Sequence, residues 1–190
     1  MKKFLLSVAA LFMVAGMAQA QVAIRSNLLS LPGGALTVGT EFALGQKWTL
    51  GIDAMGNFVN PWNFYELKGG ELMLEGRYYF CEAFNKHHIG VYAKGGYYDK
   101  MTLSNEFISK MVAGCKNSPH LPDGVHDSWN WVAGISYGYY LKLNHGWGLD
   151  FTIGGGVSMV QYKEKGENER LLTNLHYGLS RLAIDLSYKF

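Results

Sequence analysis

Apolar and polar residues alternate along most of the chain after residue 20. The pattern is clearest in residues 182–190, where large apolar residues take every second position and Ala183, Asp185, Ser187 and Lys189 stand between them. A β-strand points successive side chains to opposite faces, so this pattern predicts a strand with one apolar and one polar face. Eight segments are predicted as strands, at about residues 22–29, 35–44, 48–55, 71–80, 88–98, 129–143, 147–160 and a last one that ends at Phe190.

The connections between these segments differ in length in a regular way. Short connections lie at 45–47, 81–87 and 144–146, and long ones at 56–70, 99–128 and 163–170. Transmembrane barrels have short periplasmic turns and long outer loops, and each of their strands needs about 9–11 residues. The pattern therefore predicts an all-β fold, an eight-stranded antiparallel up-and-down transmembrane β-barrel.

The last segment changes its pattern part-way along. Leu175, Tyr177 and Leu179 have the opposite parity to Leu182 and the apolar residues after it. Either a β-bulge near Ser180 restores the phase, or the upper part of the strand stands above the membrane and packs by other rules. We favour the second explanation.

The first twenty residues have the composition of a secretory signal peptide. Lys2 and Lys3 precede a short apolar run, and residues 18–20 read Ala-Gln-Ala, a small-x-small cleavage site. The run is too short for a membrane-spanning helix. We therefore expect a signal peptide over 1–20, a single barrel domain over 21–190, and export to the outer membrane of a Gram-negative cell.

The predicted mature chain has no net charge. Removing Lys2 and Lys3 from the 17 Lys and Arg leaves 15, against 15 Asp and Glu. This balance gives no support to a nucleic-acid partner. Tyr, Phe and Trp make up 14% of the chain, which suits a barrel with aromatic girdles.

Charged residues within the strands fall almost entirely on the side opposite the apolar band. They are Arg25, Glu41, Asp53, Glu75, Arg77, Lys94, Asp150, Arg181 and Asp185. An eight-stranded barrel is only wide enough for side chains to fill its interior, so both signs of charge should pair there. We interpret this set as a lumen charge cluster that fills the barrel. The alternative is a gated path for ions.

Aromatic residues mark the ends of strands next to the short turns. Trp48 and Trp147 each follow a tight turn, and Phe80 precedes one, so we expect these three in a girdle at the inner membrane boundary. Phe190 ends the chain at the same level. A terminal strand with an aromatic last residue resembles the assembly signal of outer-membrane barrels, here carried by Leu182, Ile184, Leu186, Tyr188 and Phe190.

One candidate catalytic motif lies before the sixth strand. His126 and Ser128 resemble the His-x-Ser pair of the outer-membrane lipid A deacylases, in which an acid on the next strand completes a triad. Here the position twelve beyond Ser128 is Tyr140, and the pair has the parity of inward residues. We therefore expect no enzyme and no catalytic residues.

Other reactive residues also give no site. Adjacent residues on a strand face opposite ways, so His87 and His88 make a poor ligand pair, and we place them on a solvated turn. Cys81 and Cys115 fall on opposite sides of the membrane in this topology, beyond disulfide reach. No phosphate-binding loop or dinucleotide motif occurs, so neither a metal nor a cofactor is predicted.

Several blocks of sequence together resemble a known family. They are Asn-Leu-Leu at 27–29, Gly-Gln-Lys-Trp-Thr-Leu at 45–50, Asn-Pro-Trp at 60–62, Glu-Gly-Arg-Tyr-Tyr-Phe-Cys-Glu-Ala-Phe-Asn at 75–85 and Gly-Ile-Ser-Tyr-Gly-Tyr at 134–139. These blocks resemble a domain-of-unknown-function family of small Gram-negative outer-membrane barrels, similar in architecture to OmpA and OmpX. The resemblance implies that some relatives lie in fimbrial gene clusters and some carry an added peptidoglycan-binding domain. We expect no such addition in this chain. The resemblance implies no activity.

The function we expect is structural or adhesive. A barrel with a filled lumen would anchor the three long loops at the cell surface, where Phe58, Trp62, Phe64 and Tyr65 suit contact with a partner. Its partners would be outer-membrane lipid, the barrel-assembly machinery and an extracellular or fimbrial protein. The alternatives are a small ion channel, a soluble lipocalin-like binding barrel, which the charged face opposite the apolar band disfavours, and last a lipid A-modifying enzyme.

Overall fold

The structure is a computed structural model that describes residues 21–57, 65–103, 125–163 and 171–190. The predicted signal peptide and much of the three long loops, with Phe58, Trp62 and Phe64, lie outside these ranges. Among the described residues, no helix is both long enough and apolar enough to span a membrane.

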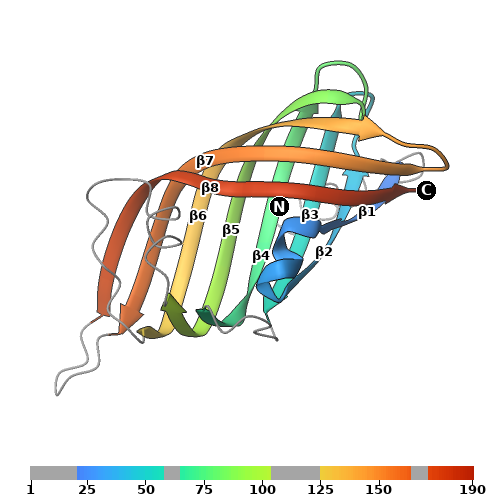
Figure 1. The fold of residues 1–190 in the computed structure, drawn as a ribbon. Coiled ribbons are helices and arrows are strands. Elements are labelled where there is room, and N and C mark those ends of the chain that lie inside the picture. Colours follow the sequence, from blue (N-terminus) through green and yellow to red (C-terminus); the bar gives the residue numbers. More distant parts are fainter. Residues whose placement is uncertain (1–20, 58–64, 104–124, 164–170) are drawn as a thin grey trace, which may run out of the picture.

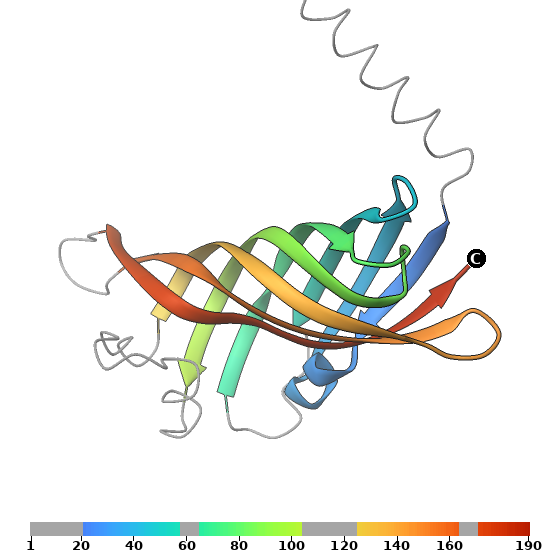
Figure 2. The ribbon, with the colours of Figure 1, turned by 90° about the horizontal axis from the view of Figure 1, so that it is seen from above.

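Eight antiparallel strands form one closed barrel in chain order, with β8 paired to β1 (Figures 1 and 2). The elements are β1 (Val22–Asn27), η1 (Leu28–Gly33), β2 (Ala35–Ala43), β3 (Trp48–Asn57), β4 (Tyr65–Tyr79), β5 (Lys86–Leu103), β6 (Val125–Lys142), β7 (Trp147–Lys163) and β8 (Leu171–Lys189). The predicted fold class is confirmed. The short turns and both ends of the described chain lie at one end of the barrel, and the strand ends Asn57, Tyr65, Leu103, Val125, Lys163 and Leu171 lie at the other.

The first strand was predicted to run to about residue 29, but β1 ends at Asn27. Leu28 and Leu29 belong to a 3-10 helix, η1, rather than to β1. Asn27 begins this helix, because its side chain accepts a hydrogen bond from Leu29 N at 3.0 Å. Gly34 ends it in the left-handed conformation, with φ 72°. A capping side chain therefore stops β1 after six residues.

The later strands are longer than predicted. β4 begins six residues before the expected start at Glu71, and β5 and β6 extend to Leu103 and Val125. The predicted 99–128 loop therefore loses residues at both ends to a sheet ladder that continues beyond the alternating segments. The wall of the barrel is consequently uneven, with 6 to 10 residues in β1–β3 and 15 to 19 in β4–β8.

The change of phase in β8 is a β-bulge, and the explanation that we favoured is wrong. Gly154 and Gly155 on β7 pair with Arg181 and Leu179, so Ser180 is the extra residue. The bulge turns both Ser180 and Arg181 inward, and Ser180 Oγ lies 2.5 Å from the Tyr92 hydroxyl inside the barrel. Leucines on both sides of the bulge consequently face outward.

The two faces of the wall differ sharply in chemistry. The outer face exposes leucines, isoleucines, valines and aromatic residues from every strand, whereas the buried side chains include most of the charged residues of the strands. A soluble protein has the reverse arrangement. This inversion is the expected one for a barrel whose solvent is lipid.

Candidate functional site

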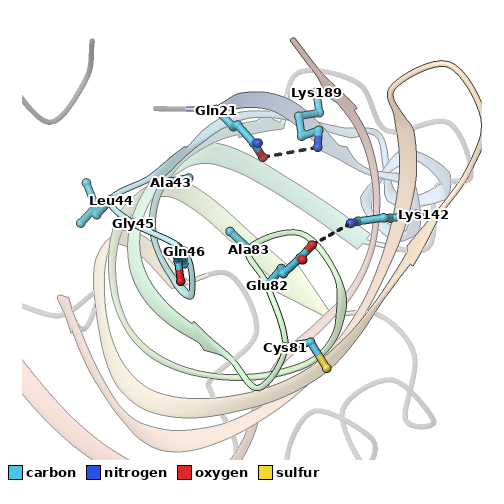
Figure 3. A pocket seen from close by; sticks show the side chains of 10 residues that line it. All are labelled: Gln21, Ala43, Leu44, Gly45, Gln46, Cys81, Glu82, Ala83, Lys142 and Lys189. Atoms are coloured by element: carbon cyan, nitrogen blue, oxygen red, sulfur yellow. Dashed lines mark hydrogen bonds and ion pairs between the residues drawn. The ribbon is translucent and has the colours of Figure 1, made fainter. Parts of the chain in front are cut away.

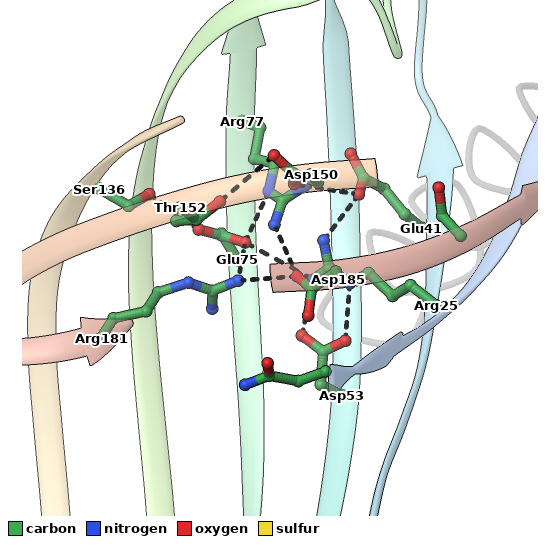
Figure 4. Close-up of polar contacts among 12 residues, drawn as sticks. Arg25, Glu41, Asp53, Glu75, Arg77, Ser136, Asp150, Thr152, Arg181 and Asp185 are labelled. Carbon is green, nitrogen blue, oxygen red and sulfur yellow. Dashed lines mark hydrogen bonds and ion pairs between the residues drawn. The ribbon is translucent and has the colours of Figure 1, made fainter. Parts of the chain in front are cut away.

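A network of buried ion pairs crosses the lumen at the level of β1 (Figure 4). Arg25 on β1 binds Asp53 on β3 with two hydrogen bonds, from Nε to Oδ1 at 2.7 Å and from Nη2 to Oδ2 at 2.6 Å. Its Nη1 donates to Glu41 Oε2 on β2 at 2.7 Å. One guanidinium thereby joins three neighbouring strands in the fork geometry that makes arginine–carboxylate pairs strong.

Arg77 on β4 is the centre of the network and is fully buried. Its Nε donates to Glu75 Oε2 at 2.6 Å, and its Nη1 donates to Asp150 Oδ2 on β7 at 2.6 Å and to Glu41 Oε2 at 2.9 Å. The side chain therefore reaches across the lumen from β4 to β7. Removing it would leave Glu75 and Asp150 without their closest cation in the buried interior.

Arg181 and Asp185 on β8 complete the network with longer contacts. Arg181 Nη2 lies 3.1 Å from Glu75 Oε2 and 3.8 Å from Asp185 Oδ2. The other cation near Asp185 is Arg77, whose Nη2 lies 3.9 Å from Oδ2. Asp185 is thus the member of the network that is held least firmly by ion pairs.

Further polar groups contact the second carboxylate oxygens of Glu41, Glu75 and Asp150. Thr49 and the Tyr79 hydroxyl donate to Glu41 Oε1 at 2.5 and 3.0 Å. Ser136 donates to Glu75 Oε1 at 2.8 Å, and His88 Nε2 lies 2.8 Å from Asp150 Oδ1. Such second partners offset much of the cost of burying charge, so the network behaves as a solid polar core.

Inward glycines give the long side chains their room. A Cβ on Gly39 would overlap the Asp53 carboxylate, and one on Gly51 would lie 2.5 Å from Arg25 Nη2. These two positions on β2 and β3 therefore need glycine so that Arg25 and Asp53 can meet.

The network has more negative than positive members. Five carboxyl groups surround three guanidinium groups, which gives a net charge of −2 when all are ionised and His88 is neutral. An uncompensated charge is costly in a closed interior. Because negative charge is in excess, replacing a carboxyl group should destabilise the fold less than replacing an arginine.

A folded turn closes the lumen below the network. The connection between β4 and β5 bends under the barrel mouth, with Ala83 N donating to Gln46 O at 2.7 Å (Figure 3). Phe84 is buried, and its ring centroid lies 6.1 Å from that of Tyr79 and 5.9 Å from that of Tyr140. These rings form an aromatic floor between the network and the turn end of the barrel.

Below this floor lies an open cup of about 750 Å³. Lys142 on β6 and Glu82 on the turn face each other across it at 3.7 Å, and Lys189 contacts Gln21 at 3.3 Å (Figure 3). The Phe84 floor separates the cup from the charged network, so the cup is a closed end rather than a passage.

The structure brings eight of the nine predicted lumen charges into one network. Lys94 is apart from it, because it lies nearer the loop end and pairs with Glu71 at 3.2 Å. Sequence reasoning missed the partners Thr49, Tyr79 and Ser136, which have inward parity but no charge.

The predicted place of His88 is wrong. We expected both histidines on a solvated turn, but β5 begins at Lys86, so His88 has inward parity and is fully buried. His87 faces outward, with Nδ1 at 2.7 Å from the Tyr137 hydroxyl. Continuing the inward series of Tyr92 and Gly90 back by two residues would have found it.

Aromatic side chains of the outer face form two groups. At the turn end, Trp48 contacts Tyr78 and Tyr78 contacts Phe80; Trp147 contacts Tyr188 and Tyr188 contacts Phe190. Toward the loop end, Tyr97, Trp129 and Trp131 form a second group. The residues predicted as a girdle thus share one end of the barrel, and all three are exposed.

Of the candidate catalytic pair, the structure describes the side chain of Ser128, whereas that of His126 lies outside its described part. Ser128 is buried, and its hydroxyl donates to the Tyr98 carbonyl at 3.3 Å. Residues 21–57, 65–103, 125–163 and 171–190 contain no group of three metal-ligating side chains. Cys81 is exposed with a free thiol, and Cys115 lies outside the described residues.

Comparison with known proteins places the chain in a family. Residues 4–190 match the family described as "Protein of unknown function (DUF3575)". The chain belongs to this family. A solved structure, the NMR solution structure of the E. coli outer membrane protein W, aligns with 90% of this chain and 98% of its own, at 13% identity and a TM-score of 0.42. No curated protein matches the chain.

Proposed function

We propose that this DUF3575 protein is an outer-membrane barrel that conducts no ions and serves as a rigid anchor for surface structures. The observation that carries the proposal is the inverted distribution of side chains, with an apolar outer face between two aromatic groups and a network of buried charges inside. Only a lipid surrounding gives such a face a favourable contact around the whole barrel.

The closed lumen supports a role outside transport. Ion pairs of 2.6 to 2.9 Å join β1–β4 and β7 across it, and Phe84 closes it below. Moving an ion through would require breaking several of these pairs together, at a cost of several kcal/mol each. The anchor would present the three long loops and the tall wall of β4–β8 at the cell surface to an extracellular or fimbrial partner.

Two measurements test this function. Expressed with its leader in a Gram-negative host, the protein should sediment with the outer membrane and resist extraction by salt and carbonate. Purified and inserted into planar bilayers, it should give no current at high protein load. Release without detergent would contradict the membrane location, and regular single-channel steps would support the channel instead.

A further inference from the structure

The outer wall of the barrel has an apolar hollow of about 690 Å³ that extends from β3 to β8. All the residues that line it are uncharged. Its floor is one row of direct cross-strand partners, formed by Gly76, Val91, Ile135, Gly155 and Leu179. The wall carries no outward side chain at the two glycines of this row, which gives the hollow its depth.

A row of larger side chains borders the hollow on the side of the short turns. Each member pairs with the next across neighbouring strands, in the order Trp48, Tyr78, Ile89, Tyr137 and Ile153. Tryptophan and tyrosine collect where the hydrocarbon of a membrane meets the lipid headgroups. The hollow therefore lies at the depth of the acyl chains, directly next to the headgroup level at the turn end.

Polar groups stand on the outer face at the turn side of this row. The exposed side chain of His87 has its Nδ1 2.7 Å from the Tyr137 hydroxyl. In the tautomer in which this hydroxyl donates to Nδ1, Nε2 carries a proton and can donate to a phosphate oxygen. Lys47 Nζ donates to Phe80 O at 3.2 Å, and Phe80 N donates to His87 O at 3.1 Å. A cation and an imidazole thus lie on the two sides of one residue.

The turn end of the barrel is basic. Its three turns and the last residues of β8, at 44–47, 80–87, 142–147 and 187–190, contain four lysines and one acidic residue, Glu82. A lysine near an anionic membrane surface is attracted to it by about 1 kcal/mol. This charge favours a lipid with a net negative headgroup over a zwitterionic lipid.

We propose that the hollow, together with His87, Tyr137 and Lys47 at its turn side, binds one anionic phospholipid of the membrane leaflet at the turn end. One acyl chain lies over Gly76, and the phosphate accepts from His87 Nε2 and pairs with the Lys47 ammonium. Close packing of the chain against the wall holds the lipid in place, since apolar groups gain little from burial inside a membrane. This inference rests on the proposed function, because it requires the outer face to lie in a membrane. It adds the class of lipid that the anchor retains.

Native mass spectrometry of the protein from detergent micelles tests the site. The micelles contain equal amounts of phosphatidylglycerol, which is anionic, and phosphatidylethanolamine, which is zwitterionic, with the same acyl chains. We expect the protein to retain one molecule of phosphatidylglycerol, with a preference of about fivefold over phosphatidylethanolamine from one nearby lysine. Equal retention of the two lipids would overturn the inference. So would the mass of a dimer without lipid, which would make a second copy the occupant of the hollow.

Gly76→Leu fills the hollow where the acyl chain would lie. A Cβ on Gly76 would lie 4.0 Å from Val91 Cγ2, which is an ordinary contact, so the barrel should accept the larger residue. We expect this variant to retain severalfold less phosphatidylglycerol than the wild type. Val38→Leu is the matched control, because it enlarges an exposed side chain of β2 outside the hollow and should leave retention unchanged.

Lys47→Gln tests the headgroup contact without touching the wall. Lys189→Gln is its control, since it removes the same charge from the turn end at a lysine that contacts Gln21 instead. We expect Lys47→Gln to remove most of the preference for phosphatidylglycerol and Lys189→Gln to keep most of it. An equal loss in the two variants would mean that only the overall charge attracts the lipid, and would overturn the site.

The outcome for the lipid site can be separated from that for the proposed function. The heat-dependent shift in gel mobility shows whether each variant is folded, and Lys47→Gln decides the matter if Gly76→Leu does not fold. If the protein sediments with the outer membrane but neither variant alters lipid retention, the lipid site is wrong and the anchor stands. If the protein is released without detergent, both fail.

Discussion

Asp150 on β7 and Asp185 on β8 are direct cross-strand partners, and both side chains face the lumen. Arg77 bridges them unequally, with Nη1 at 2.6 Å from Asp150 Oδ2 and Nη2 at 3.9 Å from Asp185 Oδ2. Like charges directly opposite each other on neighbouring strands are destabilising. The two carboxylates therefore contribute differently to the fold, although the sequence pattern treats them alike.

Replacing each aspartate with asparagine should separate these contributions. Asp150→Asn weakens the short contacts to Arg77 and His88 and should lower the free energy of unfolding by about 3 kcal/mol. Asp185→Asn removes a repulsion and only long ion pairs, so stability should change by less than about 1 kcal/mol or rise. Urea unfolding in detergent micelles, followed by tryptophan fluorescence, measures both. An equal loss in the two variants would contradict the unequal bridge.

Arg77 should be the most sensitive position of the network. Arg77→Met keeps most of the side-chain volume but leaves Glu75 and Asp150 without their nearest cation, at a cost of about 3–5 kcal/mol. Lys94→Met is the control, because it removes the separate pair with Glu71 nearer the loop end and should cost about 1 kcal/mol. The same unfolding measurement compares them. If Arg77→Met lowered the free energy of unfolding no more than Lys94→Met does, the network would not be what holds the barrel together.

Phe84 adopts a left-handed backbone conformation with φ 60° while its ring is buried. Phe84→Gly relieves the backbone strain and removes the ring, whereas Phe84→Ala removes the ring and keeps the strain. We therefore expect the alanine variant to be less stable than the glycine variant by about 1 kcal/mol. Both should still pass no current in planar bilayers, because the ionic network above remains in place. A current in either variant would make Phe84 the sole barrier of the lumen.

The alternation of side chains is enough to predict the fold and the inward set of charges. Period-two patterns determine which face each residue occupies, so the pattern alone assigns Arg25, Asp53 and Arg77 to the lumen. The change of parity between Leu179 and Leu182 also marks the bulge near Ser180, and the inward series through Tyr92 and Gly90 extends to His88, so both features can be read from the pattern. The pattern carries no information on the end of β1, because Asn27 caps η1 there and accepts from Ile184 N, a neighbour distant in sequence. The same limit hides the Phe84 floor, which requires a turn to fold back under the barrel.

The bulge at Ser180 keeps the outer face of β8 apolar along its whole length. Deleting Ser180 would remove the extra residue, so Leu179 would directly precede Arg181 and the strand would alternate regularly, with Leu175 and Leu179 still outward. We expect this variant to fold and to keep the heat-dependent shift in gel mobility. It should lose about 1 kcal/mol with the hydrogen bond to Tyr92, as Ser180→Ala should, which keeps the bulge. Loss of the folded form in the deletion variant but not in Ser180→Ala would show that the barrel needs the bulge itself.

Phe190 ends the barrel where β8 closes onto β1. Its N–H donates to Val22 O at 2.9 Å, and its ring contacts Tyr188 on the outer face, where 71% of the residue is exposed. Because so little of Phe190 is buried, Phe190→Ala should change the stability of the purified barrel by less than about 1 kcal/mol. If the last residue acts as an assembly signal, the same variant should nevertheless reduce the amount of folded protein in the outer membrane severalfold. Leu72→Ala, which removes an exposed apolar side chain from the outer face of β4, is the control and should assemble normally. Equal assembly of the two variants would contradict a special role for the terminal aromatic residue.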